Sequence, residues 1–234
     1  MEAKNLFVFS ETKLNVDSLQ QRVYDRIKKL ILTNKLKPGQ NINIDQLATE
    51  LGISHTPIRE ALAMLKLDGL VSTGYHKTPK VTDIDENDVR EIYEVRMMIE
   101  GYAIRQVTDS LTTSDLNLLK QTIANHENNI NSDTFQESAA QSDVNFHKLI
   151  TSKMKNNIFL RIFGFTEDLS LRIRTLVMAN SAEKIDVITA EHQAIYEALE
   201  KRDTEKAYHA MITHLSSACE RTVEALAHLE SFSD

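Results

Sequence analysis

Residues 44–71 have the sequence IDQLATELGISHTPIREALAMLKLDGLV, and this stretch decides the fold of the N-terminal part of the chain. Apolar residues recur every three or four positions on both sides of Gly52, which predicts two short helices joined by a turn. The two apolar faces consist of Ile44, Leu47, Ala48 and Leu51, and of Ile58, Ala61, Leu62 and Leu65. We expect Ser54 to cap the second helix. Pro57 is tolerated in its first turn because the earliest helical N–H groups have no internal partner.

The flanking segments extend this pattern to a winged helix-turn-helix. Residues 18–33 predict an amphipathic helix in front of the quoted stretch. Residues 70–73 and 79–84 predict two short strands on either side of a polar turn that begins at Gly74. In proteins with this arrangement, the second helix of the helix-turn-helix enters the major groove of DNA.

The start of that second helix and the wing contain the residues expected to contact DNA. These residues are Ser54, His55, Thr56, Arg59 and Lys77. The serine, the threonine and the lysine are expected to hold the phosphate backbone, whereas Arg59, together with His55, is expected to read base edges. The expected partner is therefore double-stranded DNA.

The same part of the chain resembles the N-terminal domain of GntR-type bacterial transcription regulators over about residues 18–84. The resemblance is carried by Pro38-Gly39, Leu47-Ala48, Leu51-Gly52-Ile53-Ser54, Thr56-Pro57-Ile58-Arg59-Glu60-Ala61-Leu62 and Gly69-Leu70-Val71. It implies DNA binding. Two positions depart from the family pattern, because His55 stands where the family usually has Arg and Thr78 where its wing usually has Gly. The bases that are read therefore cannot be carried over from the family.

Charge is divided unevenly along the chain. Residues 1–84 hold 12 Lys and Arg against 9 Asp and Glu, whereas residues 85–234 hold 15 against 25. This division assigns phosphate contact to the first part and keeps the second part off DNA. Solvated acidic helix faces are the usual explanation of such an acidic domain, and they remain the alternative here.

Two further features bear on where the protein works. The chain has one cysteine, Cys219, which excludes a disulfide within the chain and suits a reducing environment. No apolar run approaches the ~18 residues that a membrane helix needs. We therefore expect a cytoplasmic protein without a membrane partner.

From Asp85 onward the sequence predicts helices alone. Six segments are expected, at residues 86–108, 114–131, 134–154, 158–178, 182–201 and 204–231. Short loops between helices of this length predict an antiparallel bundle. The chain is thus expected to be mostly α, with an N-terminal arm (1–17), a winged helix-turn-helix domain (18–84) and an all-α bundle (85–234). Because the sequence has no Gly-rich phosphate loop, no nucleophile elbow and no HExxH, we do not expect an enzyme.

Polar residues interrupt the apolar stripes of this bundle. Asp143 and His147 lie four residues apart on one stripe, and His192 and His214 each lie on the stripe of another helix. Burying one such group unpaired costs ~1–3 kcal/mol, so we expect the four to meet. One carboxylate and three imidazoles suit a divalent metal, with zinc preferred and nickel or manganese as alternatives.

The spacing leaves two alternatives open. In the first, Asp143 and His147 form only a local pair, and the other two histidines bond to backbone or water. In the second, His126 joins the site, because it also lies on the stripe of its own helix, beside Ile123 and Ile130.

Residues 86–230 carry a second resemblance, to the ligand-binding domain named after FadR, or FCD domain, of one GntR subfamily. It rests on Asp143-Val144-Asn145-Phe146-His147, on His192 followed by Ala198-Leu199 and Asp203, and on His214. It implies that Asp143, His147, His192 and His214 are metal ligands and that His126 is not. Six helices rather than seven is similar to the VanR-like branch of the subfamily.

The same resemblance implies a pocket for a small organic acid. Arg96 matches a family position that faces the cavity, and Arg172 is a second candidate; for each, an ordinary ion pair is the alternative. The expected function is that of a homodimeric repressor that binds a palindromic operator and is released by a carboxylate effector. The rival hypotheses are a regulator with a purely structural metal and a metal-dependent hydrolase, which would leave the DNA-binding half unexplained.

Overall fold

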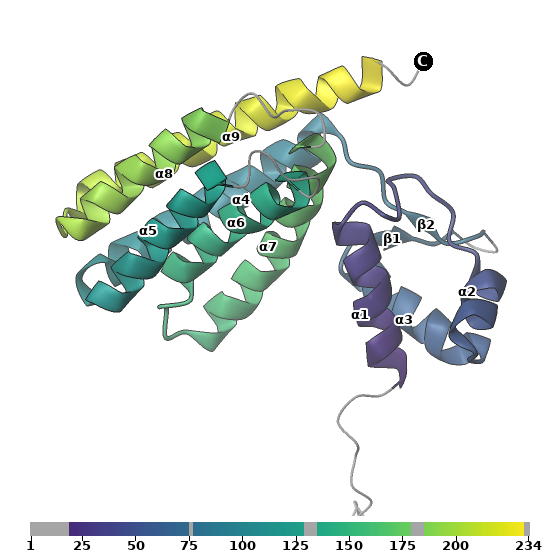
Figure 1. Ribbon diagram of the computed structural model, residues 1–234. Coiled ribbons are helices and arrows are strands. Elements are labelled where there is room, and N and C mark those ends of the chain that lie inside the picture. The colour runs from purple at the N-terminus through teal and green to yellow at the C-terminus, as the bar shows by residue number, and fades with distance from the viewer. Residues whose placement is uncertain (1–18, 75–76, 129–134, 179–184, 232–234) are drawn as a thin grey trace, which may run out of the picture. The chain divides into compact units, whose positions relative to one another are not determined.

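The computed structural model describes residues 19–74, 77–128, 135–178 and 185–231. Within these ranges the chain forms nine α-helices and one two-stranded sheet (Figure 1). The described residues group into two compact units. The first contains those up to Lys29 and those from Asn41 to Lys80, and the second contains Leu30–Gln40 and those from Val81 onward. The predicted arm at residues 1–17 lies outside the described residues, and the predicted boundary at residue 84 stays a prediction.

The N-terminal elements follow the order of a winged helix-turn-helix, which confirms the predicted fold class. They are α1 (Leu19–Leu32), α2 (Ile44–Leu51), α3 (His55–Leu67), β1 (Val71–Ser72) and β2 (Lys80–Val81). The strands are shorter than the predicted segments 70–73 and 79–84. Pro79 contributes to this because it has no N–H to donate to a strand ladder.

The turn between α2 and α3 follows from its residues. The side chain of Asn43 caps α2 by accepting a hydrogen bond from the backbone N–H of Gln46 at 3.1 Å. Gly52 ends α2 with a φ of 64°, a left-handed conformation that favours glycine. Ser54 stands at the cap position of α3, but its side chain makes no capping hydrogen bond. The predicted cap position of Ser54 is therefore confirmed, but its hydroxyl makes no hydrogen bond to the first turn of α3.

The two helices differ in how far their apolar faces are buried. In α3 the buried residues are the predicted Ile58, Ala61, Leu62 and Leu65. In α2 no residue is fully buried, and Leu51 is 40% exposed. This short helix packs mainly against α3, so its apolar face is covered from one side only.

The second unit contains the six predicted helices. They are α4 (Glu86–Val107), α5 (Thr113–Asn128), α6 (Phe135–Thr151), α7 (Asn157–Met178), α8 (Ile185–Glu200) and α9 (Thr204–Ser231), with a 3-10 turn η1 (Thr108–Ser110) after α4. Helix α9 packs along α4 and α8, and α5 packs against α6 and α8 (Figure 1). The predicted helix ends at residues 131, 134 and 182 lie outside the described residues.

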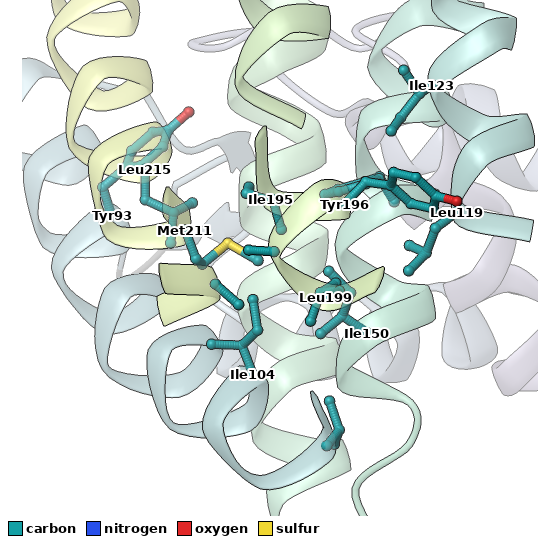
Figure 2. Packing of buried hydrophobic residues seen from close by; sticks show 14 of the residues in the cluster. Tyr93, Ile104, Leu119, Ile123, Ile150, Ile195, Tyr196, Leu199, Met211 and Leu215 are labelled. Atoms are coloured by element: carbon teal, nitrogen blue, oxygen red, sulfur yellow. The ribbon is translucent and has the colours of Figure 1, made fainter. Parts of the chain in front are cut away.

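Apolar side chains from all six helices, α4 to α9, form the core of this unit. Figure 2 labels Tyr93, Ile104, Leu119, Ile123, Ile150, Ile195, Tyr196, Leu199, Met211 and Leu215. Helices α4 and α9 approach closely at Gly101, where an added Cβ would lie 2.9 Å from a ring carbon of Tyr208. Among the described residues, no helix combines the length and the apolar character needed to span a bilayer.

Candidate metal centre

The structure brings together the four residues that the sequence singled out. Asp143 and His147 come from one turn of α6, His192 from α8 and His214 from α9, and all four are buried. One ligand atom from each lies within 4.8 Å of the others. The side chain of His126 lies outside the described residues.

Two carboxylates that the sequence analysis missed hold two of these histidines. Oε2 of Glu100 lies 2.5 Å from Nδ1 of His147, and Oε2 of Glu191 lies 2.7 Å from Nδ1 of His214. A signal for each existed, because Glu100 lies on the buried face of α4 and Glu191 directly precedes His192. Such carboxylates fix which ring nitrogen carries the hydrogen and how the ring is oriented.

Arginines balance the buried carboxylates. Nε of Arg96 donates to Oε1 of Glu100 at 2.7 Å, and both terminal nitrogens of Arg221 donate to Glu191 at 2.8 and 2.7 Å. Arg174 forms an ion pair with Oδ2 of Asp143. This leaves Oδ1 of Asp143 facing His192, whose Nε2 lies 3.3 Å away.

Burial controls the protonation of the site. Burial alone would raise the pKa of Glu100, but Arg96 and His147 hold it well below its ordinary value. Burial lowers the pKa of His147, and it lowers the pKa of His214 to about 3. Both imidazoles are therefore neutral near pH 7, which is the form that binds metals.

The geometry at the centre fits a cation. In a neutral ring whose Nδ1 hydrogen points at a carboxylate, Nε2 carries a lone pair. The Nε2 atoms of His147 and His214 are both in this state and lie 3.1 Å apart, so neither can donate to the other. Oδ1 of Asp143 lies 3.9 Å from Nε2 of His147. Ligand atoms at ~2.0–2.1 Å from a tetrahedral zinc are ~3.3 Å apart, so the donor set and its spacing fit a divalent metal.

A small cavity adjoins His147. Its wall consists of Arg96, Glu100, Val144, His147, Phe163, Glu167, Ser170 and Arg174. Arg96 lines it, as the effector prediction requires. Arg172 does not, because its guanidinium donates to the hydroxyl and the carbonyl of Thr82. Burial lowers the pKa of Arg174 to about 10, which leaves it cationic near pH 7.

The five predicted DNA-contacting residues all lie on the first unit, at the start of α3 and in the wing. The side chains of His55, Thr56, Arg59 and Lys77 are exposed. Nε2 of His55 lies 3.1 Å from Oδ1 of Asp45 on α2. The exposed N-terminal turn of α3 is the part that a recognition helix presents to the major groove, so their placement is compatible with the predicted role.

Comparison with known proteins identifies both parts of the chain. Residues 19–74 match the family model "Bacterial regulatory proteins, gntR family", and residues 91–217 match the FCD domain, whose members are known to bind metals.

Relatives match over most of their length. The HTH-type transcriptional regulator YdhC of Bacillus subtilis is 29% identical over 203 residues, which cover 87% of this chain and 90% of the relative. The HTH-type transcriptional repressor RspR of Escherichia coli is 24% identical over 90% of this chain and 92% of the relative. The structure of E. coli McbR/YncC superposes with a TM-score of 0.73 and 22% identity, over 89% of this chain and 99% of that one. The chain therefore belongs to the GntR family, in the group that carries an FCD domain, and is a DNA-binding transcriptional regulator.

Proposed function

We propose that this regulator is a repressor whose grip on DNA is released when a small carboxylate binds beside a metal ion held by Asp143, His147, His192 and His214. One observation carries the proposal: the buried Nε2 atoms of His147 and His214, whose Nδ1 atoms both face carboxylates, lie 3.1 Å apart beside a carboxylate oxygen. A divalent cation satisfies all of these acceptors together. The relative RspR is named a transcriptional repressor, which supports repression as the effect of DNA binding.

The residues around the centre support an effector site rather than a closed structural site. A divalent ion that accepts five or six ligands supplies open positions for a carboxylate oxygen beyond the four protein ligands. Zinc is preferred for three imidazoles and one carboxylate, and nickel and manganese are the alternatives. Arg96 and Arg174 line the adjoining cavity, where guanidinium groups can hold a second carboxylate oxygen. We assign this role to Arg174 in place of Arg172, which is bound to Thr82.

The proposed assembly is a homodimer formed by the helical unit. Met98 and Tyr102 on α4 and Ile158, Ile162 and Phe165 on α7 are between 45% and 68% exposed. The two faces adjoin where the rings of Tyr102 and Phe159 lie 6.3 Å apart. An exposed apolar patch of this kind favours association, and a second copy of the chain is the occupant that a palindromic operator requires.

A dimer built in this way would link the cavity to DNA. An effector that binds one arrangement of the helices more tightly shifts the dimer toward it and changes the spacing of the two recognition helices. Because the target is chromosomal DNA, we place this regulator in the cytoplasm. Its assignment to the VanR-like branch stays a prediction.

The test begins with duplexes selected from a random pool by the full-length protein purified without a tag. The proposal expects one divalent ion per chain, a two-fold symmetric selected site, and weaker DNA binding when an acid from a panel is added. The variant Ile162→Glu should be monomeric by sedimentation and should bind the selected duplex weakly.

Two results would overturn parts of the proposal. If removal of the metal by a chelator unfolds the helical unit while no acid changes the DNA affinity, the metal is structural and the protein has no carboxylate effector. If the selected site has no symmetry and Ile162→Glu stays dimeric, the proposed assembly is wrong.

A further inference from the structure

One face of α7 is unusually polar for a buried helix face. Phe163, Glu167, Ser170 and Arg174 follow one another at spacings of four, three and four residues, so they lie on a single stripe. All four line the cavity beside His147. Three of these four positions carry a polar group where the bundle core would ordinarily require an apolar one.

Several polar atoms on the cavity wall have no hydrogen-bond partner among the described residues. They are Oγ of Ser170, Nη1 of Arg96 and Oε1 of Glu167. Ser170 is 4% exposed and Arg96 is 3% exposed. Buried polar groups in folded proteins nearly always have a partner, because leaving them unpaired destabilises the fold, so the convergence of these atoms on one cavity points to a ligand that pairs with them.

The chemistry of these atoms specifies complementary groups on the ligand. Nη1 of Arg96 donates, so it requires an acceptor such as a carboxylate oxygen. When the carboxylate of Glu167 is ionised, its Oε1 accepts; burial raises the pKa of Glu167, and the Nζ of Lys148, 3.2 Å from the other oxygen, opposes this shift and favours the ionised form. A ligand must therefore bring an O–H or N–H group to Glu167. The hydroxyl of Ser170 can donate to the ligand's carboxylate or accept from its O–H or N–H group.

The balance of charge chooses between a hydroxyl and an ammonium group. Two guanidiniums and three carboxylates face the centre and the cavity, namely Arg96, Arg174, Glu100, Asp143 and Glu167. When a divalent ion is bound, the charges of these five side chains and of the ion add up to one positive charge. The charge of Lys148, whose side chain is 60% exposed, is screened by solvent and is not counted, and Glu191 is balanced by Arg221. An anion of charge −1 neutralises the site, whereas an amino acid, with no net charge, does not.

We propose that the effector is a small hydroxy monocarboxylic acid, whose carboxylate binds between the metal and Arg96 and whose hydroxyl donates to Glu167 beside Ser170. This proposal rests on the proposed function, because it names the ligand class of the same site. The cavity has room for about one water molecule, so the long side chains of its wall must shift to admit even a small acid. This favours acids of few carbons.

The test compares acids that differ by one hydroxyl. Zinc-loaded full-length protein is titrated by calorimetry with glycolate and acetate, with lactate and propionate, and with 3-hydroxybutyrate and butyrate. In at least one pair the hydroxy acid should bind about 10- to 100-fold more tightly, since a hydrogen bond to a charged group contributes ~1.5–3 kcal/mol. Malate, which carries a second negative charge, should bind more weakly than the preferred hydroxy monocarboxylate.

Variants assign the preference to α7. Glu167→Leu and Ser170→Ala should bind zinc as the wild type does and should each reduce the preference for the hydroxy acid. Asp168→Leu removes an acid from the next position of α7 that does not line the cavity, and it should keep the full preference. Ser170→Ala removes a buried hydroxyl that has no partner within the described residues, so it should fold normally.

The outcomes separate this inference from the proposed function. If the hydroxy and plain acids of every pair bind equally, and do so only with zinc present, the effector site stands and the hydroxyl assignment is wrong. If Asp168→Leu loses the preference as fully as Glu167→Leu does, a general charge effect replaces the assigned contact. If no acid of any pair binds, the effector part of the proposed function falls together with this inference.

Discussion

Replacing Glu191 by Gln tests whether the carboxylates behind the histidines position them for a metal. Oε2 of Glu191 lies 2.7 Å from Nδ1 of His214, and the side chain of Glu191 is 19% exposed. A glutamine of the same length accepts this hydrogen bond more weakly and has no negative charge. Loss of such an outer partner costs about 10- to 100-fold in metal affinity, which corresponds to ~1.4–2.7 kcal/mol.

Glu100→Gln provides the matched comparison. Glu100 holds His147 as Glu191 holds His214, but it is fully buried and its other partner, Arg96, is 3% exposed. The neutral variant leaves the Arg96 guanidinium buried without a counter-charge, which costs about 3–5 kcal/mol. Arg221 is 17% exposed and can turn toward water when Glu191 is replaced. Both variants should lose metal affinity to a similar extent, but only Glu100→Gln should lose much stability.

Two measurements separate these effects. Zinc affinity is measured by competition with a chromophoric chelator, and the free energy of unfolding of the metal-free protein by urea denaturation. If Glu191→Gln binds zinc as tightly as the wild type, the carboxylate of Glu191 does not position His214 for the metal. If metal-free Glu100→Gln is as stable as the wild type, Glu100 does not stabilise the buried guanidinium of Arg96.

Three further predictions concern other parts of the chain. Arg59→Ala should cost ~1–3 kcal/mol on the selected duplex in a gel-shift titration, and unchanged affinity would remove Arg59 from the interface. Gly101→Ala should cost ~1–3 kcal/mol in urea denaturation, because the new Cβ meets the ring of Tyr208 at 2.9 Å; an unchanged midpoint would contradict this close packing. Asp115→Ala should cost ~1 kcal/mol at pH 7, since Asp115 is part of the cap of α5. The bond from Lys153 holds the pKa of Asp115 at about 2 in place of 3.8, so this difference should be present above pH 4 and should shrink as the pH falls toward 2. A difference that persists at pH 2 would show that the charge of Asp115 contributes nothing.

The sequence predicted the helices from local spacing, which also placed polar residues on their buried stripes, whereas the choice of the four centre residues over His126 came from the resemblance to the FCD domain. Asp143 and His147 stand four residues apart, which places them on one turn of any helix. Their meeting with His192 and His214 followed from the cost of burying polar groups singly. Neither inference required knowledge of which helices are neighbours.

The misses depended on contacts between helices, which spacing along one helix does not specify. Glu100 and Glu191 act through rings on other helices, so their role becomes visible only when α4 and α6, or α8 and α9, are placed together. Arg172 was chosen as a second effector residue, whereas the structure brings Arg174 to the cavity. The two differ by two positions, or about 200° around a helix. The spacing of Phe163, Glu167 and Ser170 along α7 continues to Arg174, so following this stripe would have selected Arg174 as the effector residue.

The most direct test of the central claim is the metal content of untagged full-length protein after equilibration with one equivalent of Zn²⁺, compared with that of His214→Ala. We expect about one tightly held ion per chain in the wild type and a large loss of affinity in the variant, because one of four ligands is removed. A wild-type protein that retains no zinc, or a variant that retains it equally well, would contradict the claim that these residues form a metal centre.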